Sequence, residues 1–284
     1  MNKYILNDAI NCLDIDIHFF KEGINYAEEK CIDSIRIRTL NGNSGQSYPL
    51  DFSLLEGKTF IRRLVIRDDF KINKIISLKS LYTLNNLLHF ECMHALKIDM
   101  SYLPSLSSLY IKDDKKIENI GSITHLRELL ITSTKYDDCT HLSTLKELEE
   151  LRLCGKIKSL KGIESLSRLH YLKVSYCSDL VDLEALNKLV HLKKVHVERC
   201  KKIMDFTFLI DNPYIEDLFI DNLDSVGFVE FMPNLKKFNF WNCKDGNMNP
   251  LLKSQSLETV NFYPNKRHYT HTLEAIKDMR RKKE

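Results

Sequence analysis

Apolar residues recur on a fixed grid through the middle of this chain, and the grid constrains the fold more than any other feature. Its clearest triplets are Leu148, Leu151 and Leu153, then Leu169, Leu172 and Val174, then Leu192, Val195 and Val197. Their starting positions, 148, 169 and 192, are 21 and 23 residues apart. A period of this length with an LxxLxL core predicts one short strand and one helical or extended return in each unit. Because one unit cannot bury its apolar side alone, the units must stack.

Further triplets extend the grid over most of the chain. They begin at Ile32, Ile61, Leu106, Leu126, Ile215, Leu235 and Leu257. Leu88 and Phe90 mark the third unit in one register, and Leu84 and Leu87 offer a rival register there. The grid therefore predicts about eleven units. Between the triplets that begin at Ile32 and Ile61 lies a polar stretch, Asn41 to Pro49, which we interpret as an inserted loop.

Both ends of the chain depart from the grid. In residues 1–31, apolar residues from Leu13 to Phe19 alternate with polar ones, which predicts a strand, and Tyr26 to Lys30 predicts a helical turn. We interpret this segment as an N-terminal cap. The last segment, 267–284, predicts a helix that buries Leu273, Ile276 and Met279 on the last coil. Its other side would carry basic residues: Lys277, Arg280, Arg281, Lys282 and Lys283.

That basic helix has a rival interpretation as a membrane or nucleic-acid tail. Five basic residues on one short helix are more often a solvated face, so we favour the cap. The expected organisation is a single domain over residues 1–284, with a cap at 1–31, repeats at 32–266 and a helix at 267–284.

The pattern LxxLxLxx(C/N)xxLxxLxxLxx resembles the leucine-rich-repeat family over roughly residues 32–266. Its short units are similar to those of bacterial internalins and of phosphatase-regulating repeat proteins. The resemblance implies an α/β, right-handed solenoid with a parallel β-sheet on the concave face and short helical or 3₁₀ returns on the convex face. The family usually carries Asn or Cys eight residues after the first Leu of a unit. Cys177, Cys200 and Cys243 fit that position, whereas Asp69, Asp114 and Leu223 depart from it.

Composition argues against several classes of partner. The 42 basic and 39 acidic residues balance to a net charge of +3, which favours neither nucleic acid nor an anionic membrane. No apolar stretch is long enough to cross a bilayer, and the first 20 residues lack a signal-peptide layout. The eight Cys are scattered as expected of free thiols in a reducing compartment, so we expect a cytoplasmic protein.

Motifs for catalysis, metals and cofactors are missing from the sequence. It contains no CxxC, HExxH, GxGxxG or GxxxxGK[ST] pattern. Cys154, Cys177 and Cys200 are spaced too widely for a structural zinc site, which needs close ligand pairs. Cys154, Ser175 and His196 would be neighbours on adjacent strands, which makes a cysteine-dependent enzyme the least favoured alternative. We expect no enzyme, no cofactor and no metal.

The candidate binding residues lie on the strand face opposite the core. Alternation along each strand sends the residues before, between and after the two core-facing grid residues to that face. Basic residues gather toward the N-terminus: Arg36, Arg38, Arg63, Arg67 and Lys112. Aromatic and acidic residues gather toward the C-terminus: Asp217, Phe219, Asp221, Trp241 and Tyr263. His89, Tyr110, Arg152, Lys173 and His196 lie between these two groups. With Arg36, they are assigned to the middle position of their strands.

Aromatic residues and Arg dominate the energy of many protein interfaces. We therefore expect a non-catalytic protein-binding module that grips a protein partner. Small bacterial repeat proteins of this kind resemble antidote (immunity) proteins, so the most specific expectation is an immunity protein that neutralises a toxin domain. The alternative is an adaptor or regulatory subunit that positions an enzyme, as phosphatase-regulating repeat proteins do. We expect no nucleic-acid or membrane partner.

Overall fold

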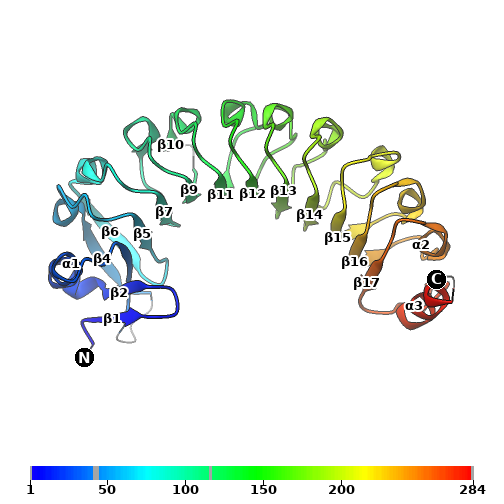
Figure 1. The fold of residues 1–284 in the computed structure, drawn as a ribbon, viewed down its shortest axis with the longest axis horizontal. Helices are drawn as coiled ribbons and strands as arrows, with labels where there is room; N and C mark the ends of the chain where they lie inside the picture. The colour runs from blue at the N-terminus through cyan, green and yellow to red at the C-terminus, as the bar shows by residue number, and fades with distance from the viewer. Residues whose placement is uncertain (1, 41–44, 115–116, 283–284) are drawn as a thin grey trace. The chain divides into compact units, whose positions relative to one another are not determined.

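The computed structural model of the protein describes residues 2–40, 45–114 and 117–282. The chain forms two compact units, Met1–Thr132 and Ser133–Glu284, termed unit 1 and unit 2 below. In each unit, successive strands lie along one side of the coils and short helical returns lie along the other (Figure 1). The single domain over residues 1–284 stays a prediction.

The sheet of unit 1 takes one strand from each successive coil. In spatial order its strands are β1 (Tyr4–Asn7), β2 (Cys12–Asp16), β3 (Ser34–Arg38), β5 (Arg63–Ile66), β7 (His89–Cys92), β9 (Ser108–Lys112) and β11 (Glu128–Thr134). Neighbouring strands are parallel except β1 and β2, which are antiparallel. Ile35 and Ile37 of β3 are fully buried while Arg36 and Arg38 are not, because successive strand residues point to opposite faces.

The segment that is predicted to be an N-terminal cap contains the β1–β2 hairpin and two helices. A 3₁₀-helix, η1 (Ile17–Phe19), leads into α1 (Phe20–Glu29), which buries Phe20, Ile24 and Ala27. Asp16 ends the strand, because its carboxylate accepts a hydrogen bond of 3.0 Å from the His18 backbone N–H and so caps η1. The observed strand therefore ends earlier than predicted, at Asp16. The predicted helical turn is the end of a longer helix, α1.

The returns of unit 1 combine short strand pairs with 3₁₀-helices. β4 (Ser47–Asp51) pairs with β6 (Lys71–Ile76), and β8 (Ile98–Asp99) pairs with β10 (Ile117–Glu118). The 3₁₀-helices are η2 (Phe52–Leu55), η3 (Leu78–Thr83), η4 (Met100–Tyr102) and η5 (Ile120–Ser122). The predicted loop from Asn41 to Pro49 is thus partly wrong, because its last three residues belong to β4; residues 41–44 lie outside the described residues.

The strands that lie wholly in unit 2 are all parallel to their neighbours. These strands are β12 (Glu150–Gly155), β13 (Tyr171–Ser175), β14 (Lys194–Glu198), β15 (Asp217–Leu223), β16 (Lys237–Cys243) and β17 (Thr259–Phe262). Their grid residues pack in register in the core. At the C-terminal end, the buried rings of Phe238, Phe240 and Phe262 stack one after another, at centroid distances of 5.2 and 4.9 Å.

The returns of unit 2 are short helices. They are η6 (Thr140–Leu142), η7 (Ile163–Ser165), η8 (Glu184–Lys188), η9 (Thr207–Leu209), η10 (Gly227–Phe231) and α2 (Asn249–Lys253). The chain continues into α3 (Leu273–Arg281), the predicted C-terminal helix. Within the described residues, no helix has the length and apolar character that crossing a bilayer requires.

Helix α3 covers the end of unit 2 differently from the prediction. Ile276 is buried as expected, but Met279 is 42% exposed. Arg280 was assigned to the solvated side, yet its guanidinium donates to the carbonyls of Leu251 (2.6 Å), Ser254 (3.1 Å) and Leu257. The carbonyls of Leu251 and Ser254 lie at the end of α2, where a helix leaves acceptors unsatisfied, and that of Leu257 lies just before β17. Lys283 lies outside the described residues.

The third unit of the grid was wrongly placed. Phe90 and Cys92 are buried in β7, with Leu87 buried just before them, whereas Leu88 is 41% exposed. Phe90 pairs with Leu64, and Cys92 pairs with Ile66. The thiol of Cys92 acts as a small hydrophobe in a position that Ile, Leu, Val or Phe fills in other coils, which hid the register in the sequence.

Candidate functional site

The candidate site is the sheet face that carries the side chains between the buried grid residues. We term it the unit-1 face on β2, β3, β5, β7, β9 and β11, and the unit-2 face on β12 to β17. Each strand contributes side chains before, between and after its two buried residues, and neighbouring strands place equivalent side chains side by side because they are parallel and in register.

The middle positions of the unit-2 face line up as the grid predicted. Arg152 lies opposite Lys173, and Lys173 lies opposite His196. His196 in turn lies opposite Phe219, and their rings stack at 4.2 Å between centroids. The residues that are scattered in sequence therefore form one continuous row.

Aromatic side chains form the C-terminal end of the unit-2 face. Phe219 meets Trp241 edge to face, at 5.2 Å between ring centroids. Trp241 is 43% exposed and Tyr263 is 80% exposed. Tyr263 directly follows β17, in the strand position that corresponds to Trp241 in β16, since Phe240 pairs with Phe262. Two large exposed rings thus occupy equivalent positions of neighbouring coils.

Carboxylates on the unit-2 face are paired with neighbouring cations. Glu150 pairs with Arg152 (2.9 Å), Glu198 with Lys173 (3.0 Å) and Asp217 with Lys194 (3.5 Å). The ring of Tyr171 has the cations of Arg152 and Lys194 over it, each 5.5 Å from its centroid. These contacts hold the charged side chains in defined positions around the row of rings.

His196 is held neutral within this row. Burial lowers the pKa of His196 more than the hydrogen bond with Glu198 (3.0 Å) raises it. Burial would raise the pKa of Glu198, but the hydrogen bonds from Lys173 and His196 outweigh it and lower that pKa. The neutral imidazole can therefore stack on Phe219 while its Nε2–H donates to the Glu198 carboxylate.

Asp221 does not belong to the exposed face as predicted. It is only 5% exposed, and its carboxylate accepts a 2.9 Å hydrogen bond from the backbone N–H of Arg199. Arg199 has a φ of 54°, so this carboxylate supports a left-handed turn after β14. Asp221 is therefore not one of the exposed side chains of the unit-2 face.

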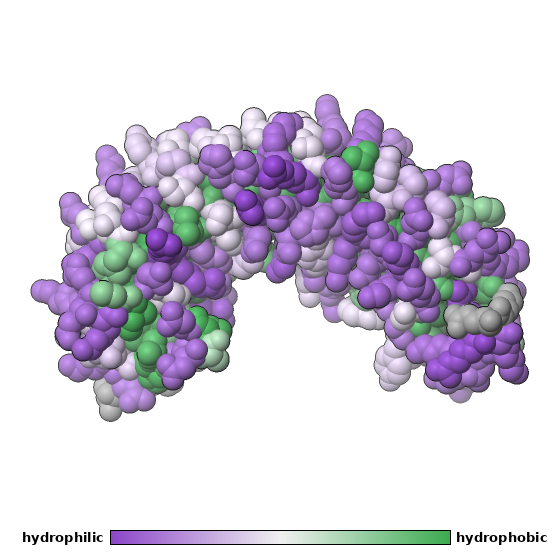
Figure 2. All heavy atoms as spheres, in the orientation of Figure 1, coloured by the Kyte–Doolittle hydropathy of each residue, from purple (hydrophilic) through white to green (hydrophobic). Residues whose placement is uncertain are grey.

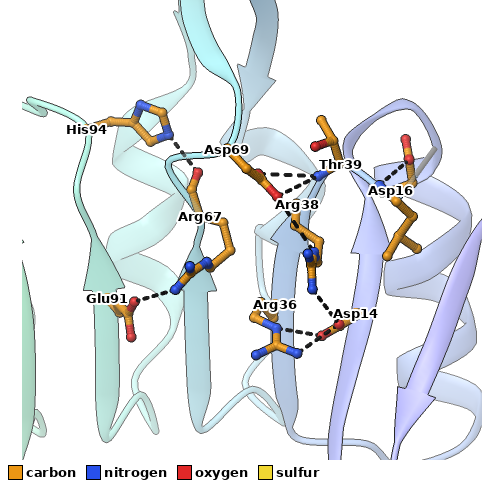
Figure 3. A network of polar contacts seen from close by, with 10 residues as sticks. Asp14, Asp16, Arg36, Arg38, Thr39, Arg67, Asp69, Glu91 and His94 are labelled. Atoms are coloured by element: carbon orange, nitrogen blue, oxygen red, sulfur yellow. Dashed lines mark hydrogen bonds and ion pairs between the residues drawn. The ribbon is translucent and has the colours of Figure 1, made fainter. Parts of the chain in front are cut away.

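The predicted basic group of the unit-1 face is largely neutralised from within (Figure 3). Asp14 is 6% exposed and accepts from both Nε (2.6 Å) and Nη2 (2.8 Å) of Arg36. It also accepts from Nη1 of Arg38 (3.3 Å), whose Nε lies 3.6 Å from Asp69. Asp69 further accepts from the Thr39 backbone N–H. These arginines hold the first coils together.

The next strands of the unit-1 face continue this polar network. Arg67 lies 3.6 Å from the carboxylate of Glu91, and Lys112 lies 4.0 Å from that of Asp114. The Tyr110 hydroxyl donates to Glu128 at 2.8 Å. Arg63 is half-buried in β5, opposite His89 of β7. The basic residues are therefore present on this face, but most of them already have an anionic neighbour.

His89 lies on the unit-1 face but not in the middle position assigned to it. It is the first residue of β7, and Glu91 takes the middle position opposite Val65 and Tyr110. The His89 Nδ1 lies 2.9 Å from the Ser108 hydroxyl. The His89 imidazole, whose Nε2 lies 3.9 Å from the Glu91 carboxylate, is the main cause that lowers the pKa of Glu91. The assignment was wrong because the third unit was read two residues out of register.

The residues considered for catalysis are only partly brought together. Cys154 lies opposite Ser175, but His196 lies opposite Lys173 and hydrogen bonds with Glu198. Burial raises the pKa of Cys154, which lowers its content of reactive thiolate. Within the described part of the chain, no group of three or more His, Cys, Asp or Glu residues is arranged to hold a metal ion.

Two kinds of residue in these faces were missed. The first kind is the acidic partners Asp14 and Asp69, which lie in the cap and in a turn. The second is Tyr171 and Lys194, which lie just before the first buried residue of their strands. The same two-residue alternation would have found Tyr171 and Lys194. No sequence pattern pointed to the pairing of Asp14 with Arg36, because the cap does not follow the repeat.

Several exposed aliphatic side chains of unit 1 lie in the cap hairpin and in β6, and among them Ile5 pairs with Asp14 and so lies on the same side of the sheet as the unit-1 face. Ile5, Leu6 and Ile10 of the cap hairpin and Ile75 of β6 are each more than 40% exposed. In Figure 2, hydrophobic residues gather over the N-terminal part of the chain, whereas the view is otherwise mostly hydrophilic. Large exposed rings are therefore a feature of the unit-2 face, whereas the exposed apolar residues beside the unit-1 face are aliphatic.

Comparison with known proteins gives the class of fold. Neither a protein-family model nor a curated protein sequence matches the chain. Among solved structures, an internalin (inlF) from Listeria monocytogenes is 17% identical over 93% of this chain and 86% of that chain, with a TM-score of 0.55. A leucine-rich-repeat protein of Leptospira interrogans is 18% identical over 75% of this chain and 50% of that chain, with a TM-score of 0.43. Internalin C2 of L. monocytogenes is 17% identical over 85% and 83%, with a TM-score of 0.37.

The chain therefore has the leucine-rich-repeat solenoid fold. The predicted α/β solenoid, with a long parallel sheet, short helical returns and a C-terminal helix, is confirmed. At this level of identity the likeness concerns the fold alone, so the function must be argued from the faces themselves.

Proposed function

We propose that the chain is a non-catalytic protein-binding solenoid that holds a protein partner on the unit-2 face. The observation that carries this proposal is the pair of exposed rings, Trp241 and Tyr263, at the end of a row of side chains that are already packed and paired. Large aromatic side chains are typical anchors of interfaces, and each can contribute about 2 kcal/mol or more.

The surroundings of these rings support a preformed docking surface. His196, Phe219 and Trp241 contact one another in sequence, and the neighbouring carboxylates of Glu198 and Asp217 are paired with lysines. Little side-chain ordering remains to be done when a partner binds, and such preorganisation favours tight association. Arg152, Lys173 and Lys194 would meet the charged rim of the partner and mainly affect association rate and selectivity.

The finer proposal is that the partner is a toxin domain and the chain its cytoplasmic antidote. A rigid surface with aromatic anchors and mixed charge suits an antidote that covers the active site of its target. The eight free thiols favour a reducing compartment. The alternative remains an adaptor that positions an enzyme. In either role, the predicted unit-1 residues Arg63, Arg67, Tyr110 and Lys112 are proposed as weaker contacts, because most of them already have partners.

Partner capture with matched variants tests the proposal. Trp241→Ala and Tyr263→Ala should each weaken the complex about 30-fold, as expected for the loss of roughly 2 kcal/mol. Phe231→Ala is the control, because Phe231 is 51% exposed but lies in η10 on the return side. The circular dichroism spectra of all three variants should match the wild type. Equal affinity of the wild type and both ring variants would refute the unit-2 face as the binding surface.

Stoichiometry and a growth assay separate the two finer roles. An antidote should form one tight complex of fixed composition, and its co-production with the captured protein should restore the growth of cells that the protein alone arrests. Trp241→Ala should lose that rescue. Several partners of weaker affinity, with no effect on growth, would exclude the antidote and favour the adaptor.

A further inference from the structure

Two cysteines occupy equivalent positions in neighbouring coils of unit 2. Cys177 follows β13 by two residues, and Cys200 follows β14 by two residues. The ends of these strands are paired in register, since Ser175 lies opposite Glu198. Because the two strands are parallel, the two cysteines are related by a shift of one coil.

Contacts of the two thiols repeat with the same shift. The Cys177 Sγ lies 3.5 Å from the carbonyl of Ser175 in its own coil and 3.7 Å from that of Leu153 in the preceding coil. The Cys200 Sγ lies 3.5 Å from the carbonyl of Glu198 and 3.8 Å from that of Val174. Equivalent atoms in neighbouring coils are separated by one strand spacing, about 4.8 Å. That spacing falls within the Cα separations that disulfides span, roughly 4.4 to 6.8 Å.

We propose that Cys177 and Cys200 form a peroxide-sensitive thiol pair, which closes to a disulfide and links two neighbouring coils of unit 2. The reaction takes one molecule of hydrogen peroxide. The Cys200 sulfur attacks one peroxide oxygen and becomes a sulfenic acid, while the other oxygen leaves as water. The Cys177 sulfur then attacks the Cys200 sulfur, and the second oxygen leaves as water. Two thiols and one peroxide thus give one disulfide and two waters.

The interaction between the two thiols sets their roles in this reaction. It lowers the pKa of Cys200 and, with burial, raises the pKa of Cys177. Cys200 therefore carries more thiolate and reacts first, and Cys177 acts as the resolving thiol. Cys200 is 4% exposed and Cys177 is fully buried, so a small oxidant is the reagent that suits this pair.

Cys243 provides a matched control within the same unit. It occupies the corresponding place in its coil, but the neighbouring coil carries Leu223 there, directly paired with it in register. Burial, followed by a hydrogen bond with Asp245, raises the pKa of Cys243 to about 12. Cys243 therefore has neither a resolving thiol next to it nor an accessible thiolate. Cys31, which is exposed, serves as the reactive reference.

Peptide mapping after oxidation tests the proposal. The folded protein is treated with hydrogen peroxide until Cys31 is fully oxidised, quenched with catalase, unfolded, alkylated with iodoacetamide and digested. We expect the peptides that contain Cys177 and Cys200 to be joined with the loss of two hydrogen atoms, while Cys243 stays an alkylated thiol. Reduction with dithiothreitol should separate the joined peptides.

A melting experiment gives an independent readout. The link closes a loop in the unfolded chain, so oxidised wild type should unfold on the order of 5 °C above the reduced protein. Cys200→Ser and Cys177→Ser should remove both the joined peptide and this shift, and their reduced forms should keep the wild-type circular dichroism spectrum. The proposal is overturned if both thiols are alkylated after Cys31 is consumed, or if Cys200 is recovered as a sulfinic acid with Cys177 free.

Discussion

Replacing Asp14 tests whether the arginines of the unit-1 face are structural. Asp14→Asn removes a carboxylate that accepts two hydrogen bonds from Arg36, at 2.6 and 2.8 Å, and one from Arg38 at 3.3 Å. Removing one partner of a buried ion pair costs about 3 to 5 kcal/mol. The Arg36 and Arg38 side chains are 21% and 37% exposed, so solvent compensates part of that loss. We expect unfolding free energy to fall by about 2 to 3 kcal/mol.

Urea unfolding followed by circular dichroism measures this loss. Asp137→Asn is the control, because the ion pair of Asp137 with Lys158 (3.0 Å) is exposed on both sides and its loss should cost less than about 0.5 kcal/mol. The double variant Asp14→Leu with Arg36→Met should recover part of the stability, since neither charge is then left buried. A change below about 0.5 kcal/mol for Asp14→Asn would refute the structural role. Arg36 and Arg38 would then return as candidates for partner binding.

Two further predictions concern stability. Gly155 has a φ of 149°, and a Cβ there would lie 2.5 Å from the backbone N and O of Thr134. Gly155→Ala should therefore lower the free energy of unfolding by roughly 2 kcal/mol or more. Gly227→Ala is the control: its Cβ would meet only the Ser225 hydroxyl, at 3.3 Å, so this variant should melt close to the wild type. The folded-state pKa of Glu91 is lowered, chiefly by the neighbouring His89 imidazole. Its contribution to stability is therefore present above the unfolded pKa of about 4.3 and is lost as the pH falls through the lower folded value. Unfolding free energy measured between pH 5 and pH 3 should fall more steeply for the wild type than for Glu91→Gln, and equal slopes would contradict this origin.

Repetition explains why most of the sheet could be predicted from the sequence. A strand that recurs with an LxxLxL core has one possible alternation, so the row Arg152, Lys173 and His196 followed from the grid, and the structure aligns them. The predicted register was wrong where one residue deviates from the LxxLxL pattern. At β7, Cys92 replaces a large aliphatic residue, and the register was placed on the exposed Leu88.

Side-chain partners could not be predicted in the same way. Whether an exposed-face residue is free depends on neighbours that lie a whole coil away, such as Asp14 for Arg36 across 22 residues. Asp221 shows the same effect, because the turn after the preceding strand requires its carboxylate. The repeat fixes which face a residue occupies, but the pairing on that face depends on individual residues outside the pattern.

The cost of removing groups from water decides which face offers a docking surface. An arginine that is paired with a buried carboxylate, as Arg36 is, would have to give up that pair or stay neutralised in a complex, so it adds little net affinity. An exposed ring gains affinity simply by leaving water. Trp241 and Tyr263 keep much of their surface exposed while Phe219 and His196 support the row from one side. The gain from burying these two rings is therefore still available to a partner, and this asymmetry is the reason why we propose the unit-2 face as the binding surface.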